Sequence, residues 1–293
     1  MYGIVRHLRY NLDSYLCSAL LGIADALVTR LVAAANEREQ FRVILVLPQH
    51  PSGDFLNPSR YPVIERNMAM QNKSLLAIVE SFQKQCPNVI WSEYLGFFSL
   101  RNWGIMNDKV VTSSVFVSSS VLIVDDRVAV VGGAGINDQG MRGTHDSNIA
   151  MSIEDNTPVS IQLGGRSYEA SRFAHTLRMN LMRHHIADHD PFSTDLTDMA
   201  THAHVPMANA GISVERLNGY DGVWQRIATQ NAELHNLLDG EYSLSNIKSV
   251  DAFRKKNVKE NFIHKSTHDP HVQAMVEKVQ GFLVPFPLHF SMS

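Results

Sequence analysis

The chain has 293 residues, of which 44% are hydrophobic and 19% charged, a composition typical of a globular protein with a substantial core. The formal net charge of −3 provides no global positive field, so we expect no nucleic-acid partner. The two cysteines, Cys17 and Cys86, form neither a disulfide framework nor a zinc-ligand spacing, which favours a reducing, cytoplasmic location. No apolar run approaches the ~20 residues of a membrane span and no clear signal-peptide cleavage pattern is present, so we expect any membrane contact to be peripheral.

The first third of the chain shows two helical patterns around one strand pattern. Apolar residues recur every three or four positions over residues 16–35, which predicts an amphipathic helix. Residues 41–47 are almost continuously apolar and end at Pro48, a pattern typical of a buried parallel strand after a crossover helix. A second helix is predicted over residues 72–85, with Asn72 as its N-terminal cap.

Residues 89–102 form an aromatic segment that we expect to be extended. Trp91 and Phe97 are candidates for the core, because aromatic side chains in strands usually pack there. A second interpretation is that these two side chains line a lipid groove.

A hairpin is predicted further along, from two apolar runs at 121–124 and 128–131 that are separated by a charged triplet beginning with Asp125. The glycine-rich residues 132–135 follow, and they let the backbone leave the sheet through conformations closed to residues with a Cβ.

Two more helices are predicted, over 167–185 and 223–238, and residues 184–211 between them lose periodicity. This irregular segment is rich in histidine and aspartate, and His185 and His189 have i, i+4 spacing. No closed ligand set follows them, so we predict no metal and no cofactor.

Residues 248–265 carry six Lys or Arg and two acidic residues. A solvated helix face explains this excess. The alternative is an anionic membrane surface contacted through Lys255 and Lys256.

The hairpin region resembles the second signature motif of eukaryotic-type phospholipase D, which runs His-x-Lys, four residues, Asp, six residues, Gly-Ser-x-Asn. The flanks match, and the positions that carry the chemistry differ. Asp125 and Gly132 agree with the motif, and so do Asn137 and Asp138 after it, for which we expect structural roles. The family's histidine, lysine, serine and asparagine, and the glutamate that orients the histidine, are replaced here by Ser118, Ser120, Gly133, Gly135 and Asn148 respectively.

The resemblance covers residues 22–290 and implies a fold and a chemistry. Members of the family have two similar lobes, and each lobe gives one histidine motif to a shared phosphodiesterase site. This chain resembles the second lobe only, and it contains no His-x-Lys anywhere. We therefore expect a single α/β lobe over 1–293, with a mixed, mainly buried sheet between helices on both faces.

The leading functional prediction is a phospholipase D family pseudoenzyme without catalytic side chains. A hydroxyl without a neighbouring base cannot replace an imidazole, and Ser120 supplies no positive charge for phosphoryl oxygens. Asp125 is expected to accept backbone hydrogen bonds and hold the hairpin. One alternative is half of an active phospholipase D, completed by a second lobe or by a homodimer. Another is a module that binds phospholipid or a partner; a serine site assisted by His145 has the weakest support, because no Gly-x-Ser-x-Gly elbow is present.

Overall fold

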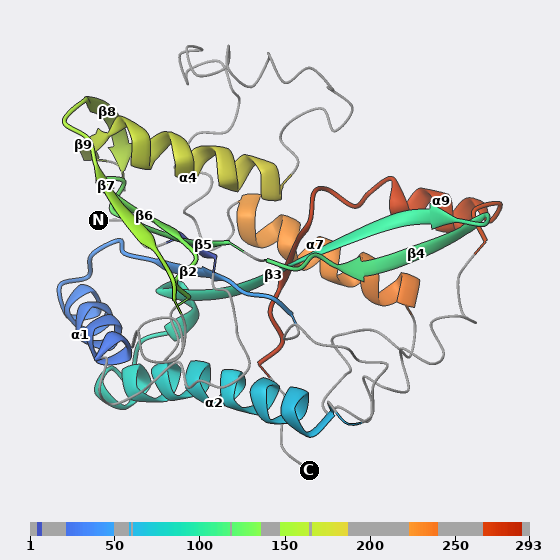
Figure 1. Ribbon diagram of the computed structural model, residues 1–293, viewed down its shortest axis with the longest axis horizontal. Coiled ribbons are helices and arrows are strands. Elements are labelled where there is room, and N and C mark those ends of the chain that lie inside the picture. The colour runs from blue at the N-terminus through green and yellow to red at the C-terminus, as the bar shows by residue number, and fades with distance from the viewer. Residues whose placement is uncertain are drawn as a thin grey trace.

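The computed structural model describes residues 5–7, 22–49, 59, 61–117, 119–135, 147–163, 166–186, 223–239 and 266–288. These residues form a mixed sheet with helices on both faces, which confirms the predicted fold class (Figure 1). None of the helices in these ranges is both long and apolar enough to cross a bilayer.

The main sheet has eight strands in the order β10-β3-β2-β1-β5-β6-β7, with β4 paired to β3. The neighbours β1–β2 and β2–β3 are parallel and the other pairs are antiparallel, so the parallel strand predicted over 41–47 is confirmed. The strands are β1 Val5–His7, β2 Val43–Val46, β3 Leu95–Met106, β4 Lys109–Ser114, β5 Ser120–Val124, β6 Val128–Gly132, β7 Ala150–Glu154 and β10 Leu283–Pro285.

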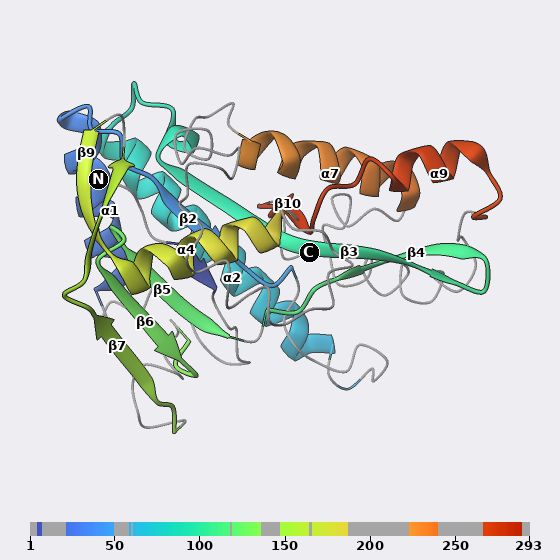
Figure 2. The ribbon, with the colours of Figure 1, turned by 90° about the horizontal axis from the view of Figure 1, so that it is seen from above.

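In the part of the chain that the structure describes, helices cover both faces of this sheet (Figures 1 and 2). On one face lie α1 (Ile23–Asn36) and α2 (Tyr61–Gln85), and on the other lie α4 (Arg172–His185) and α7 (Val223–Asp239). The described ranges also contain the 3-10 helix η2 (Trp91–Glu93), the separate hairpin of β8 (Pro158–Leu163) with β9 (Arg166–Ser171), and α9 (Pro270–Val276).

Strand β2 shows why its sequence is apolar without alternation. Val43 and Leu45 pack among residues of α1 and α2, whereas Ile44 and Val46 pack among residues of α4 and α7. Successive side chains of a strand point to opposite faces, and here both faces are covered by helices. The strand therefore has no solvated side that would favour a polar residue.

The predicted start of the second helix is wrong. Helix α2 begins at Tyr61 rather than Asn72, and Pro62 is accommodated in its first turn, where no intrahelical N–H bond is needed. Asn72 lies buried inside the helix, where its Nδ2 donates to the carbonyl of Met68 at 3.0 Å. A cap residue and an interior asparagine have the same sequence signature, and only packing distinguishes them.

The helix predicted from residue 167 also begins later, at Arg172. Residues 166–171 instead form β9, which pairs along its whole length with β8. The helix predicted over 223–238 is confirmed as α7, with Trp224 and Ile227 buried against the sheet.

Candidate functional site

The hairpin of β5 and β6 closes through a tight turn at Asp125 and Asp126. Both residues have positive φ angles, 50° and 52°, and Arg127 N donates to Val124 O at 2.9 Å. Two consecutive left-handed residues are the signature of the turn that best fits the twist of a hairpin, and aspartate is among the residues that tolerate it. The antiparallel pairing of β5 with β6 confirms the predicted hairpin.

Asp126 anchors this turn to helix α4 through a buried cluster of three charged or polar side chains. Its Oδ1 accepts from Arg178 Nε at 2.6 Å, and its Oδ2 accepts from Arg178 Nη2 at 2.7 Å and from His175 Nδ1 at 2.8 Å. All three side chains are almost fully buried. The two-point contact with the planar guanidinium fixes the position of the hairpin relative to the helix.

The cluster changes the acidity of Asp126. Burial by itself raises the pKa of this carboxyl, but the hydrogen bonds and positive charge of Arg178, with the hydrogen bond of His175, outweigh it and lower the pKa from 3.8 to about 2. The carboxylate form is therefore the one that the fold stabilises.

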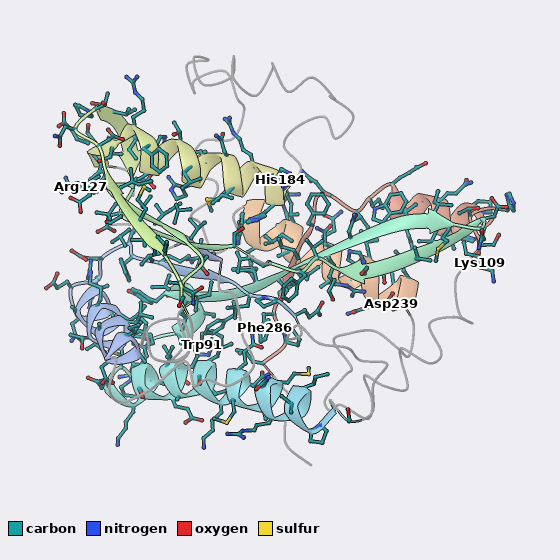
Figure 3. The ribbon with its side chains drawn as sticks, in the orientation of Figure 1. Trp91, Lys109, Arg127, His184, Asp239 and Phe286 are labelled. Atoms are coloured by element: carbon teal, nitrogen blue, oxygen red, sulfur yellow. The ribbon has the colours of Figure 1, made fainter. Side chains whose placement is uncertain are left out.

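The neighbouring Asp125 has a different environment. Its Oδ1 is buried without a hydrogen-bond partner, and burial raises the pKa of its carboxyl. Its backbone oxygen accepts from Tyr168 Oη at 2.9 Å, and Arg127 lies over the ring of Tyr168 at 4.8 Å. Figure 3 shows Arg127 at this end of the hairpin and His184 at the far end of α4. The carboxylate that holds the hairpin is thus that of Asp126, which the sequence analysis did not single out.

One signal in the sequence points to this cluster. His175 and Arg178 are three residues apart and so share one helix face, and both fall in a helix that follows an acidic hairpin turn. Their joint contact with Asp126 could not be predicted without the packing of α4 on the hairpin.

Three of the matched motif positions, Ser120, Gly133 and Asn148, lie at the opposite end of the hairpin from Asp126. Ser120 pairs with Gly132, and Gly132 pairs with Ala150 of β7. A Cβ on Gly133 would lie 3.2 Å from Oδ1 of Asn148, so these two substituted positions are neighbours. Ser120 Oγ is buried and has no hydrogen-bond partner.

Gly132 is required for steric reasons. A Cβ at this position would lie 2.2 Å from the carbonyl oxygen of Ile149 and 2.5 Å from Cα of Ala150. Both are backbone atoms, in the residue just before β7 and in the first residue of β7, so they cannot move away independently of that strand. The agreement of Gly132 with the motif thus has a physical basis in the close approach of two strands.

His175, which contacts the hairpin, does not take the place of the histidine of the family's motif. His175 binds Asp126 at the turn, while Ser120 begins β5 at the other end, about 13 Å of strand away. Ser118, His145, Asn137, Asp138, His189, Lys255 and Lys256 lie outside the described residues. Gly135 is described and buried.

Trp91 and Phe97 lie together in the core beneath the sheet. Their ring centroids are 6.1 Å apart, Phe97 is buried among residues of α1 and α2, and Trp91 packs half-buried against the same cluster. Phe97 is therefore a core residue and not a lipid-facing one. Within the described ranges no group of three or more His, Cys, Asp or Glu side chains is arranged to hold a metal ion.

Comparison with known proteins relates this chain to one family. The sequence model of the family described as Phospholipase D matches residues 19–210. Phospholipase D B of Dictyostelium discoideum is 30% identical over 266 residues, which cover 91% of this chain and 20% of that protein. Phospholipase D C of the same organism is 31% identical over 241 residues, 81% of this chain and 14% of that protein.

A human relative shows the same pattern. Phospholipase D1 of Homo sapiens is 27% identical over 277 residues, which cover 92% of this chain and 24% of that protein. The chain thus spans a quarter or less of the length of these relatives. With a family match over more than half of its residues and a mixed sheet between helices on both faces, this chain belongs to the phospholipase D family.

Proposed function

We propose that this chain is a catalytically impaired member of the phospholipase D family that keeps the lobe and has lost the groups for phosphodiester cleavage. The single observation that supports the proposal is the set of residues at the matched motif positions. Ser118 and Ser120 replace the histidine and lysine, and Gly133 and Gly135 replace the serine and asparagine.

The chemistry explains why these replacements matter. Proton transfer by a positioned imidazole contributes roughly 10²- to 10⁴-fold to a rate, and a serine hydroxyl cannot replace it without a neighbouring base. Ser120 Oγ is buried without a hydrogen-bond partner. Stabilisation of charge on the phosphoryl oxygens requires cations or hydrogen-bond donors, and glycine offers no side chain for either. Such groups act as a unit, so the loss of one of the first two is enough to remove most turnover.

An activity assay tests the proposal. Purified chain incubated with choline-labelled phosphatidylcholine is expected to release no choline and to form no phosphatidic acid, while an active phospholipase D run in parallel releases both. Robust release by this chain that is abolished in Ser118→Ala would overturn the proposal.

The alternative, half of an active enzyme, requires a partner lobe. We expect no release when this chain is mixed with a separately expressed first lobe of a phospholipase D. The matched variant restores the motif with Ser118→His, Ser120→Lys, Gly133→Ser and Gly135→Asn. If the mixture releases choline with this variant and not with the wild-type chain, the missing side chains, and not the pairing of lobes, limit the activity of the wild-type chain. Release with the wild-type chain would establish the half-enzyme alternative instead.

A second candidate function, peripheral binding to a membrane, is favoured by the tip of the β3–β4 hairpin. The hairpin extends away from the body of the sheet, with Lys109 at its tip (Figures 2 and 3). Ile105 and Met106 are 64% and 58% exposed there, and they point to opposite sides of the strand. A flat protein surface would cover only one of them, whereas a lipid headgroup layer surrounds both.

The base of this hairpin is held by hydrogen bonds to α7, and its tip pairs with the residue that follows the basic segment. Arg101 of β3 and Thr112 of β4 both donate to the carboxylate of Asp239 at the end of α7, each at 2.5 Å. Lys109 pairs with Ser266, the residue that directly follows the basic segment 248–265. The exposed apolar pair and the cationic segment can therefore engage the same anionic surface.

Vesicle pelleting measures this candidate function. With vesicles of phosphatidylcholine and phosphatidylserine, we expect Lys255→Ala with Lys256→Ala, and separately Ile105→Ser with Met106→Ser, to reduce the bound fraction at least about tenfold. Ile90→Ser, at a residue of similar exposure (59%) beside η2, serves as the control and should bind as the wild type does. Binding that is unchanged in both double variants would rule the candidate out.

A further inference from the structure

Strand β7 leaves one edge of the main sheet open. It pairs with β6 on one side, and no strand in the described ranges pairs with its other side (Figure 2). Gly133 N donates to Ile149 O at 2.9 Å, so Ile149 directs its backbone groups toward β6. Because these groups alternate along an antiparallel strand, the N–H and C=O of Ala150 and Ser152 point outward.

Among the described residues, this edge lacks three of the usual protections against another strand, which are lysine, proline and a bulge. Residues Ala150–Glu154 contain no lysine and no proline. Their register with β6 runs without interruption from Ala150 to Glu154, so no bulge twists the edge away. An open edge with these properties is a template for pairing with another strand.

The side chains beside the edge are apolar and exposed. Ile149 is 85% and Met151 63% exposed, and alternation places both on the face that Ile153 shares. Helix α4 lies over this face, and its Phe173 is 39% exposed and donates its N–H to Asp155, just beyond β7, at 2.6 Å. An apolar strip and a row of outward hydrogen-bonding groups therefore lie side by side.

The outward backbone groups determine what kind of partner can cover this strip. Lipid tails offer no hydrogen bonds to a backbone N–H or C=O, whereas an extended peptide satisfies them all. We propose that a second copy of this chain binds here, by antiparallel pairing of β7 with its own symmetry mate about Met151. This joins the two sheets into one, and it holds whether or not the proposed loss of catalysis is correct.

The order of apolar and charged residues along β7 favours that register. Centred on Met151, the pairing sets Ile149 opposite Ile153 of the second copy and lets the outward groups of Ala150 bond those of Ser152. Glu154 then faces Asn148, so no like charges meet. Centring the pairing on Ser152 would set the apolar Ile149 opposite the charged Asp155. The Met151 register is a closed twofold contact, the commonest symmetry of soluble homo-oligomers.

Sedimentation equilibrium of the full chain tests the proposal. We expect a concentration-dependent dimer whose dissociation constant rises at least about tenfold in Ser152→Pro. This substitution removes an N–H that points outward, so the pairing with β6 is kept. Met151→Lys, which sets two like charges opposite each other, should have the same effect, and Ile90→Lys should leave the dimer unchanged.

Covalent trapping gives a readout that does not depend on these variants folding normally. In the proposed register the two copies of residue 151 form a non-hydrogen-bonded pair with Cα atoms about 4.5 Å apart, which is within disulfide reach. Mild oxidation of Met151→Cys should produce a covalent dimer, and Ile90→Cys should not. A wild-type chain that stays monomeric at its highest soluble concentration, or a dimer unaffected by both Ser152→Pro and Met151→Lys, would overturn the proposal.

Discussion

Asp126→Asn is expected to lower the free energy of unfolding by about 3–5 kcal/mol, because it leaves the buried guanidinium of Arg178 without its counter-charge. The replacement keeps the shape of the side chain and tolerates the positive φ of the turn, so the change in charge dominates. Urea denaturation at neutral pH, followed by far-UV circular dichroism, measures the loss.

The adjacent aspartate provides the matched control. Asp125→Asn has the same chemistry and the same left-handed backbone, but Oδ1 of Asp125 has no partner to lose and its pKa is raised by burial. We expect this variant to be as stable as the wild type at neutral pH, or slightly more stable. Equal losses in the two variants would show that the turn, and not the Asp126 cluster, determines the effect.

The cost of Asp126→Asn should also depend on pH. The folded-state pKa of about 2 lies below the ordinary value of 3.8 for an aspartate, so the ionised carboxylate contributes stability that is fully present above about pH 4. This contribution, about 2 kcal/mol from the difference in pKa, is lost as the pH falls through 2. The difference in unfolding free energy between wild type and Asp126→Asn should therefore narrow in acid, and a constant difference would contradict the assignment.

Gly132→Ala is expected to destabilise the chain by about 1–3 kcal/mol, because its Cβ overlaps the backbone of Ile149 and Ala150. Relief would require β7 to move away from β6, and this movement disrupts the ladder of hydrogen bonds between the two strands. The measurement is again the free energy of unfolding, with amide hydrogen exchange of β6 and β7 to locate the loosened region.

Gly104→Ala is the control for this substitution. Gly104 also lies in a strand, β3, and a Cβ there meets no atom within 4 Å. Because alanine restricts the unfolded chain more than glycine does, the variant should be unchanged or more stable by about 0.4–1 kcal/mol. A loss in Gly104→Ala as large as that in Gly132→Ala would mean that strand glycines matter here for a reason other than close approach.

Local patterns in the sequence were sufficient for the elements whose signal is periodic. Three elements were predictable in this way: the strand at 41–47, the hairpin around Asp125 and the helix over 223–238. A strand or helix with a buried face repeats its apolar residues at a characteristic spacing, and that spacing is visible in the sequence. The boundaries were less predictable. Asn72 was predicted as a cap and is an interior residue, and residues 167–171 were predicted to begin a helix and belong to a strand.

The proposed replacement of the motif's histidine, lysine, serine and asparagine by Ser118, Ser120, Gly133 and Gly135 was predicted from the sequence, since it depends only on the order of residues along the chain. Tertiary structure alone determined the hydrogen bonds of Asp126 with His175 and Arg178. It also determined that Gly133 and Asn148 are neighbours. Their contacts join residues far apart in the chain, and no local spacing encodes how α4 packs on the hairpin or how closely β7 approaches β6. The spacing of apolar residues in the sequence indicates which side of a helix or strand is buried. Which element packs against that side depends on the close packing of the whole fold.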